Sequence, residues 1–295
     1  MIRGIIKAIV KDKFLVISKS KRQNNVKLKF SGFLLIIFLF FSTISFGQTW
    51  EFGGFVGTAG YMGDLNPINP VKVNNLAFGA QIKRNFDGYW SLKLNAAHGK
   101  VEAADSKSDN KQFRNRNLSF FSPVTELSLQ TEFNFFRYIP SISKKIYSPY
   151  LFIGVGVVSF NPQTTFEGNV YQLTDYPTEG QKYNTLALSM PLGAGVKYNF
   201  SGKWTLGAEI GYRTAYTDYI DDVSTVYLAE RLDNPDKPND SAMARLLSDR
   251  SFQVGEPEHR SGTQRGDYRK NDTYLFLGFT ISYTLFNIKC PVVDD

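Results

Sequence analysis

The sequence predicts an all-β protein, an eight-stranded antiparallel transmembrane β-barrel with long extracellular loops, preceded by a cleaved signal peptide. Three observations predict this fold class. Eight runs alternate between apolar and small or polar side chains, which is the period of a β-strand. The connections between them alternate between long and short, as in outer-membrane barrels. The chain also begins with the pattern of an export signal.

The first segment reads as a targeting signal. Residues 1–29 hold nine Lys and Arg but one acid, Asp12, and an apolar run follows at residues 33–41. Small residues, Ser45 and Gly47, precede Gln48 at the positions where signal peptidase requires them. The alternative is an uncleaved anchor, but the apolar run is shorter than the roughly 20 residues needed to span a bilayer. We therefore predict a signal peptide over 1–47 and a mature barrel over 48–295.

Removing the signal changes the charge argument. The whole chain has 34 basic and 27 acidic residues and a net charge of +7, but residues 30–295 have 25 and 26, a net charge of −1. The basic character therefore belongs to the leader, and it gives no support for nucleic-acid binding.

The clearest alternation lies in residues 186–213. The even positions of residues 186–200 hold Leu, Met, Ala, Val, Tyr and Phe, whereas the odd positions hold Ala, Ser, Pro, Gly, Lys and Asn. After the turn 201–203, residues 204–213 repeat the pattern. Two such runs around a short loop containing Gly predict a hairpin. An apolar outer face and a small or polar inner face are typical of a strand that crosses a membrane.

The remaining strands follow the same rule. The eight predicted strands are residues 50–61, 76–86, 89–98, 118–136, 149–160, 186–200, 204–213 and 273–288. The connections are long at 62–75, 99–117, 161–182 and 220–271, tight at 87–88 and 201–203, and intermediate at 137–148. Long loops are expected outside the cell, and an even strand number places both termini in the periplasm.

A soluble lipocalin-like barrel also alternates and is the alternative fold. It would need a charged outer face, yet the second face of these strands is mostly Gly, Ala, Ser and Thr. Such small residues suit the narrow interior of an eight-stranded barrel.

The last long loop contains a predicted short helix. Asn239, Asp240 and Ser241 can cap a helix that continues to about Ser248. The apolar side of this helix holds Met243, Leu246 and Leu247. We favour a loop that tucks this side onto the rim of the barrel over a lid that binds a partner.

Five charged residues fall in the inward phase of the predicted strands: Glu126, Glu132, Lys197, Glu209 and Arg213. Buried charges must be paired, so we expect an interior charge network that fills the barrel. A conducting pore is disfavoured at this strand number.

The sequence shows no catalytic motif. Its two histidines, His98 and His259, lie in no metal-binding spacing, and His98 has no Ser or carboxylate beside it. We expect no catalytic residues, no cofactor and no metal, although some small outer-membrane barrels modify lipids and this remains a less favoured alternative.

Several segments together resemble a known family. They are Tyr61–Asn66, Arg116–Phe120, Glu126–Asn134, Ser148–Tyr150, Thr178–Gln181, Pro191–Gly193 and Thr217–Ser224. In order and spacing they are similar to the PorG-like outer-membrane β-barrels of the Bacteroidota type IX secretion system. The resemblance implies a non-enzymatic component that associates with a periplasmic ring of PorK and PorN. The predicted topology, however, places Thr178–Gln181 and Thr217–Ser224 outside the cell, so these two segments are expected to serve loop folding or a different partner.

The resemblance leads to a predicted partner surface. The single cysteine, Cys290, follows the last strand and, in an oxidising compartment, is either free or bonded to another chain. We expect Cys290, with the turns 142–147 (Ile142 to Tyr147) and 201–203 (Ser201 to Lys203), to lie at the ring contact. A general surface-binding or stabilising barrel is the alternative function.

Overall fold

The computed structural model describes residues 49–67, 69, 72–140, 146–227, 238–267 and 269–285, all within the second of the chain's two units, Gly47–Asp295. The predicted signal peptide, Ile142, Cys290 and the end of the last predicted strand lie outside these residues. The strands are β1 Thr49–Met62, β2 Val73–Asn85, β3 Trp90–Ala104, β4 Ser119–Asn134, β5 Tyr147–Phe160, β6 Gln163–Phe166, β7 Asn169–Gln172, β8 Leu186–Ser201, β9 Trp204–Ala215 and β10 Thr273–Leu285. The helices are η1 Asp105–Lys107, α2 Lys111–Arg116, η2 Leu173–Asp175, α3 Pro238–Ser248 and η4 Ser251–Val254.

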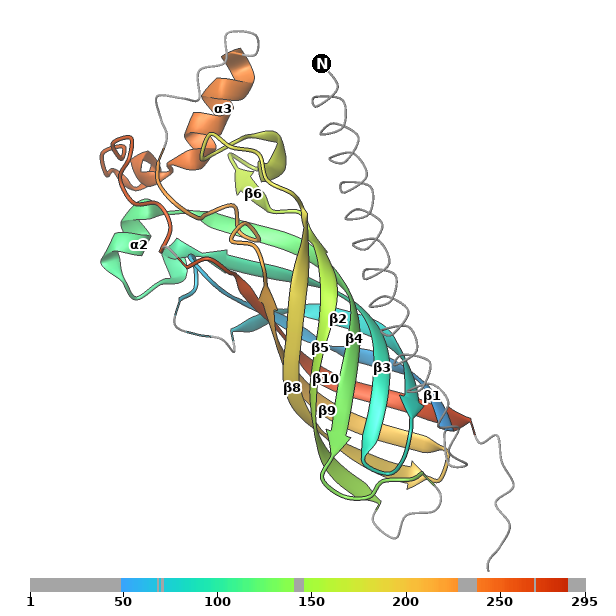
Figure 1. Cartoon of the computed structure of the whole chain (residues 1–295). Helices are drawn as coiled ribbons and strands as arrows, with labels where there is room; N and C mark the ends of the chain where they lie inside the picture. The colour runs from blue at the N-terminus through green and yellow to red at the C-terminus, as the bar shows by residue number, and fades with distance from the viewer. Residues whose placement is uncertain are drawn as a thin grey trace, which may run out of the picture. The chain divides into compact units, whose positions relative to one another are not determined.

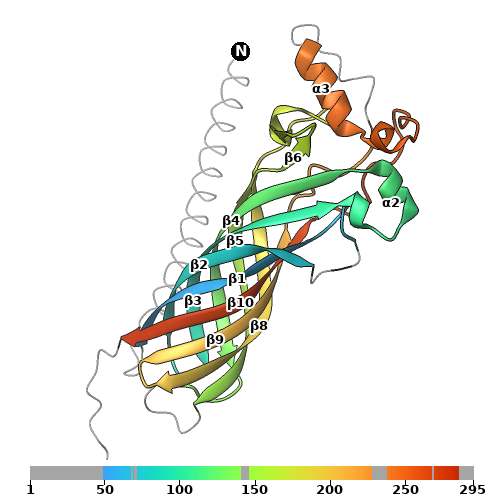
Figure 2. The same cartoon turned by 180° about the vertical axis from the view of Figure 1, so that it is seen from behind.

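Eight strands close into an antiparallel barrel. The order β3-β2-β1-β10-β9-β8-β5-β4 is closed by pairing between β3 and β4, as Figures 1 and 2 show from opposite sides. The first and last strands of the barrel pair from Trp50 with Leu285 to Met62 with Thr273. The predicted fold class, an all-β eight-stranded antiparallel barrel, is therefore confirmed.

The seam between β1 and β10 depends on glycine. Gly57 pairs with Gly278, and a Cβ added to Gly57 would lie 2.2 Å from the carbonyl oxygen of Leu277 and 2.6 Å from the Cα of Gly278. Because neither glycine carries a side chain, the two backbones can approach more closely here than any other residue pair would allow.

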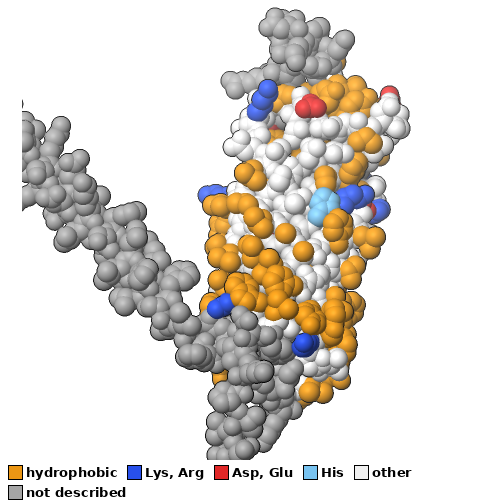
Figure 3. All heavy atoms as spheres, turned by 90° about the vertical axis from the view of Figure 1, so that its right-hand side faces the viewer, with side chains coloured by type: hydrophobic (Ala, Val, Ile, Leu, Met, Phe, Trp, Pro, Cys, Tyr) orange, Lys and Arg blue, Asp and Glu red, His pale blue; other side chains and the backbone are white. Residues whose placement is uncertain are grey.

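The alternation of side chains determines the two faces of the wall. On β8 the even positions Leu186, Leu188 and Leu192 are exposed, whereas Ser189 and Lys197 are buried inside. Figure 3 shows hydrophobic side chains gathered on one face of the wall, mainly in the half nearer the short turns. An outward apolar face is the arrangement that the sequence predicts for a membrane barrel.

Two predicted loops contain more strand than expected. β3 continues to Ala104, and β6 and β7 form a hairpin within the predicted loop 161–182. The hairpin extends from the edge of β4, where Phe121 pairs with Gln163. Paired strands therefore extend past the closed part of the barrel at the end with the long loops.

The long connections fold into a roof, which we define as residues 62–67, 105–118, 161–185, 216–227, 238–267 and 269–272. It lies at the end of the barrel opposite the short turns (Figure 1). The predicted helix is present as α3, with Leu247 buried, Met243 packed against the core and Leu246 exposed. Met243 and Leu247 are therefore placed as expected of a loop that tucks its apolar side inward, whereas the expectation was wrong for Leu246. Among the described residues, none of the helices is both long and apolar enough to cross a bilayer.

Candidate functional site

Among the residues that the structure describes, the interior of the barrel holds eight charged side chains that balance one another. Each is at most 6% exposed, and the inward positions of six strands supply them. The carboxylates are Glu51, Glu126, Glu132 and Glu209, and the cations are Lys83, Lys93, Lys197 and Arg213. Equal numbers of both signs satisfy the requirement that buried charges be paired.

Glu132 is the centre of this interior network. Its Oε2 lies 2.6 Å from the Nζ of Lys197 and 3.1 Å from that of Lys83, and its Oε1 lies 3.3 Å from the Nζ of Lys93. Lys83 also lies 3.6 Å from Glu51, and Lys93 lies 3.2 Å from Glu209. One carboxylate on β4 therefore contacts cations from three other strands across the lumen.

A second group lies nearer the roof. The Nε of Arg213 is 3.6 Å from Oε2 of Glu126, and the guanidinium stands 4.6 Å from the ring centre of Phe276. The Tyr274 hydroxyl donates to the same Glu126 oxygen at 2.5 Å. Although Glu209 and Arg213 share a strand face, the ion-pair partner of Arg213 is Glu126, while Glu209 accepts from Tyr150 at 2.9 Å.

All five charged residues expected inside are thus found inside, but the sequence reasoning missed Glu51, Lys83 and Lys93. The sequence carries a signal for them, because Glu51 and Lys93 have apolar residues on both sides and Lys83 lies in the inward phase of a strand whose other face holds Phe78, Ala80 and Ile82. Chemically, the arrangement fills the lumen with fixed pairs. It offers no free nucleophile or base among these eight groups, since each contacts a partner of opposite charge.

In the roof, Arg116 joins three connections. It donates to both carboxylate oxygens of Asp105, at 2.7 and 2.8 Å, and to the backbone carbonyls of Arg265 and Asp64, at 2.5 and 3.0 Å. This side chain is buried. The bidentate pair orients the guanidinium, so that its remaining hydrogens reach the other two loops.

Arg265 links the connection between β5 and β8, which contains Glu179, to the rest of the roof. Its Nη1 donates to Glu179 at 2.9 Å and to the carbonyl of Asp222 at 2.5 Å. The carboxylate of Asp222 accepts from the hydroxyls of Thr178 and Tyr183, both at 2.6 Å. Burial raises the pKa of Asp222 to about 7, although Arg265 opposes this shift.

These contacts show what the two segments that were expected outside the cell do in the fold. Thr178–Gln181 and Thr217–Ser224 bind each other, since Glu179 also accepts from the backbone N–H of Ser224 at 2.9 Å. Tyr61–Asn66 and Arg116–Phe120 belong to the same roof through the contact between Arg116 and Asp64. A role in loop folding therefore accounts for all four segments.

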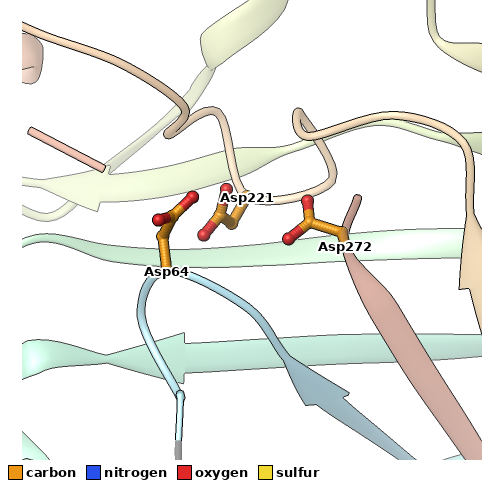
Figure 4. Close-up of side chains that lie close together, drawn as sticks. All are labelled: Asp64, Asp221 and Asp272. Carbon is orange, nitrogen blue, oxygen red and sulfur yellow. The ribbon is translucent and has the colours of Figure 1, made fainter. Parts of the chain in front are cut away.

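Three aspartates of the roof meet close to the ends of β1 and β10, as Figure 4 shows. Asp64, Asp221 and Asp272 each offer a carboxylate oxygen, and these oxygens lie within 4.8 Å of one another. Burial first, and then the neighbouring Asp221 carboxylate, raise the pKa of Asp64 to about 10. Burial and neighbouring aspartates likewise raise the pKa values of Asp221 and Asp272. The sequence predicts no metal site; Asp64 and Asp221 belong to the segments that carry the family resemblance, where no ligand role was expected of them.

The two histidines lie apart. The Nδ1 of His98 is 2.8 Å from the Thr125 hydroxyl, and its ring is 5.3 Å from that of Phe78. His259 stacks on Tyr227 at 4.5 Å and contacts Asp249 at 3.0 Å. Neither histidine joins a hydroxyl and a carboxylate in the manner of a catalytic triad.

The predicted partner surface is described only in part. Tyr147 and the turn 201–203 lie at the end of the barrel with short turns, where β5 and β8 pair through Tyr147 and Tyr198. The side chains of Tyr147, Ser201 and Lys203 are exposed. Ile142 and Cys290 lie outside the described residues.

Comparison with solved structures finds matches that cover 80% of this chain. A major outer membrane protein from Thermus thermophilus is 12% identical, with 80% of this chain and 99% of that chain covered and a TM-score of 0.38. OprG, an outer membrane protein of Pseudomonas aeruginosa, is 11% identical, with 80% and 96% covered and a TM-score of 0.33. The N-terminal β-barrel domain of OprF from the same organism is 12% identical, with 80% and 97% covered and a TM-score of 0.34. These TM-scores are too low to support an argument about the fold. The barrel is established by its own strand pairing.

The sequence comparisons identify one family. No curated protein matches the chain. A family described as a domain of unknown function (DUF6089) matches residues 30–228. Because this match extends over more than half of the chain, the protein belongs to the DUF6089 family.

Proposed function

We propose that the protein is a non-enzymatic outer-membrane component of the type IX secretion machinery, where it anchors or stabilises a periplasmic ring of the PorK/PorN type. The observation that carries this proposal is a barrel with an apolar outer wall and an interior filled by balanced ion pairs. Such a barrel is suited to hold a position in the membrane and unsuited to conduct a solute. The secretion role itself rests on the resemblance of the quoted sequence segments to PorG-like barrels.

The outer wall supports the membrane location. On β8 exposed apolar residues run from Leu186 to Phe200, which at about 3.3 Å per residue and a tilt of roughly 40° reaches about 35 Å along the barrel axis. This exceeds the apolar band of about 25 Å that such barrels present to lipid. The three tryptophans, Trp50, Trp90 and Trp204, are exposed near the short turns, where an aromatic girdle is expected at the membrane interface.

The interior supports a static role. Glu132, with three lysines around it, occupies the lumen at the level where β2, β3, β4 and β8 face one another. Moving a solute past this point would require the separation of buried pairs, which is expensive. The roof adds a second closure through Arg116 and Arg265.

The end with short turns is the proposed ring contact. Long loops of such barrels face the outside of the cell and short turns face the periplasm, which would place both termini on the periplasmic side. Tyr147, Ser201 and Lys203 are exposed at this end. We include Ile142 and Cys290 in the contact from the sequence alone.

The test is chemical crosslinking in isolated outer membranes followed by purification of the protein. We expect ring proteins to be recovered with the wild type and with Lys111→Glu, which changes an exposed lysine on α2. Recovery should fall with Lys203→Glu, which makes the same charge change at the short-turn end. If no ring protein is recovered while the barrel is intact, the protein is a general stabilising barrel instead.

The proposed disulfide has its own test. A non-reducing gel of native membranes should show a shifted band in the wild type that is absent in Cys290→Ser. A monomer band in both, with complete thiol labelling of the wild type, would remove the disulfide and leave the rest of the proposal in place.

A further inference from the structure

The aspartate cluster of the roof joins parts of the chain that are distant in sequence. Asp64 follows β1, Asp221 lies in the loop after β9, and Asp272 immediately precedes β10. Their side chains are 1%, 2% and 1% exposed. In Figure 4 the three carboxylates point toward one another, and their oxygens lie within 4.8 Å of each other.

No cation of the described residues forms an ion pair with this cluster. Arg116 reaches only the backbone carbonyl of Asp64 and gives its ion pair to Asp105. Arg265 pairs with Glu179 and Asp222. Three buried carboxylates thus face one another without an ion-pair partner in the part of the chain that the structure describes, an arrangement that is unfavourable unless something else supplies positive charge.

Two further observations point to a missing ligand. The Oδ2 of Asp64 is buried and has no hydrogen-bond partner among the described residues, although buried carboxylate oxygens are normally satisfied. The hydroxyl of Tyr61 lies 2.5 Å from Oδ2 of Asp221 and 2.8 Å from Oδ1 of Asp272. A hydroxyl has one hydrogen and donates to one carboxylate, so the second short contact requires either a protonated acid or one cation that both oxygens bind.

We propose that Asp64, Asp221 and Asp272, with the hydroxyl of Tyr61, form a binding site for a hard divalent cation, Ca²⁺ or Mg²⁺. Carboxylate and hydroxyl oxygens are the ligands that these cations take. Oxygens that bind Ca²⁺ at about 2.4 Å are at most about 4.8 Å apart, which accommodates the observed spacing. The set contains no nitrogen or sulfur, so it does not favour Zn²⁺ or copper.

Such a cation would link the roof connections to one another where they leave the barrel strands. It would connect the loop between β1 and β2 to the loop after β9 and to the start of β10, which the described residues join at this point through hydrogen bonds alone. This site is independent of the ring contact at the other end of the barrel and goes beyond the proposed function.

The experiment uses the intact protein purified in detergent and freed of metal with a chelator. Tb³⁺, a luminescent substitute for Ca²⁺, is added while tyrosine is excited, because Tyr61 lies close enough to transfer energy to the bound ion. We expect the luminescence to saturate with added Tb³⁺ and to fall when Ca²⁺ or Mg²⁺ displaces the bound Tb³⁺. The ion that competes at the lower concentration is the natural ligand. Ca²⁺ should also raise the unfolding temperature and chelator should lower it, because a ligand that binds only the folded state stabilises it.

Single variants decide whether the three aspartates are the ligands. Asp64→Asn, Asp221→Asn and Asp272→Asn should each weaken Tb³⁺ binding roughly tenfold or more, as loss of a site residue does. The matched control is Asp175→Asn, which removes an exposed carboxylate elsewhere in the roof, and binding should stay within about threefold because solvent screens that charge.

Two results would overturn the site. One is the absence of saturable luminescence together with an unfolding temperature that does not respond to Ca²⁺, which would mean that protons neutralise the cluster. The other is equal binding by the wild type and all three ligand variants. If a variant fails to fold, the response of the wild-type unfolding temperature and luminescence still decides.

Discussion

Glu132→Gln is the most informative perturbation of the interior. The change removes one negative charge and keeps the shape of the side chain. In the wild type the carboxylate lies 2.6, 3.1 and 3.3 Å from the ammonium groups of Lys197, Lys83 and Lys93. After the change the interior network holds one more positive than negative charge.

The magnitude follows from what each lysine keeps. Lys83 retains Glu51 at 3.6 Å and Lys93 retains Glu209 at 3.2 Å. Lys197 loses its carboxylate and keeps the amide oxygen of Asn134 at 3.0 Å. Leaving one buried charge without its partner costs about 3–5 kcal/mol. The glutamine oxygen still accepts a hydrogen bond, so we expect a loss near the lower end, about 3 kcal/mol.

The assay is urea unfolding of the barrel in lipid vesicles, followed by the mobility of unboiled samples in a denaturing gel. The control is Glu102→Gln, since Glu102 pairs with Lys100 at 3.2 Å where the two side chains are 30% and 46% exposed. An exposed pair contributes about 0–1 kcal/mol. The double variant Glu132→Gln with Lys197→Met should recover part of the loss, because it removes the unpaired charge. Equal unfolding midpoints for Glu132→Gln and Glu102→Gln would refute the interior network.

Three further predictions concern the wall, the seam and the roof. Val155→Arg, on the exposed face of β5, should lower the free energy of unfolding in vesicles by about 2–4 kcal/mol. Leu76→Arg, near the loop end of the wall, should lower it by about 0–1 kcal/mol. Equal losses would contradict the placement of Val155 against lipid at the middle of the membrane. Gly57→Val should reduce the folded fraction seen by gel mobility, because its Cβ would lie 2.2 Å from the Leu277 oxygen, whereas Gly54→Ala meets only one atom at 3.7 Å and should fold normally. Arg116→Met should leave the barrel's gel mobility unchanged and speed trypsin cleavage in the roof loops, and an unchanged cleavage rate would show that Arg116 does not hold the roof.

The wall was predictable from sequence because a β-strand has a period of two. Apolar residues such as Leu188 and Phe279 then point outward by position alone, and Glu126 or Lys197 point inward. Lys93 obeys the same rule, because it stands between the outward residues Leu92 and Leu94 and is therefore predicted to point inward. The closure of the sheet also follows, since eight strands of one amphipathic pattern leave no edge exposed when they close.

The roof was not predictable in the same way. Its contacts join residues that are far apart in sequence, as Arg116 with Arg265 and Tyr61 with Asp272, and no periodicity relates them. The strands β6 and β7 were missed because four-residue runs carry too little alternation to distinguish from a loop. The aspartate cluster likewise appears only when folding brings the connection between β1 and β2 together with both ends of the connection between β9 and β10.

The most direct test of the central claim, that this chain is a barrel held in the outer membrane, is the gel mobility of protein in isolated outer membranes before and after boiling. We expect the protein in the outer-membrane fraction, resistant to extraction without detergent, with unboiled and boiled samples migrating at different positions because the closed barrel resists the denaturant until it is heated. Recovery in the soluble periplasmic fraction without detergent, with one mobility in both samples, would contradict the claim.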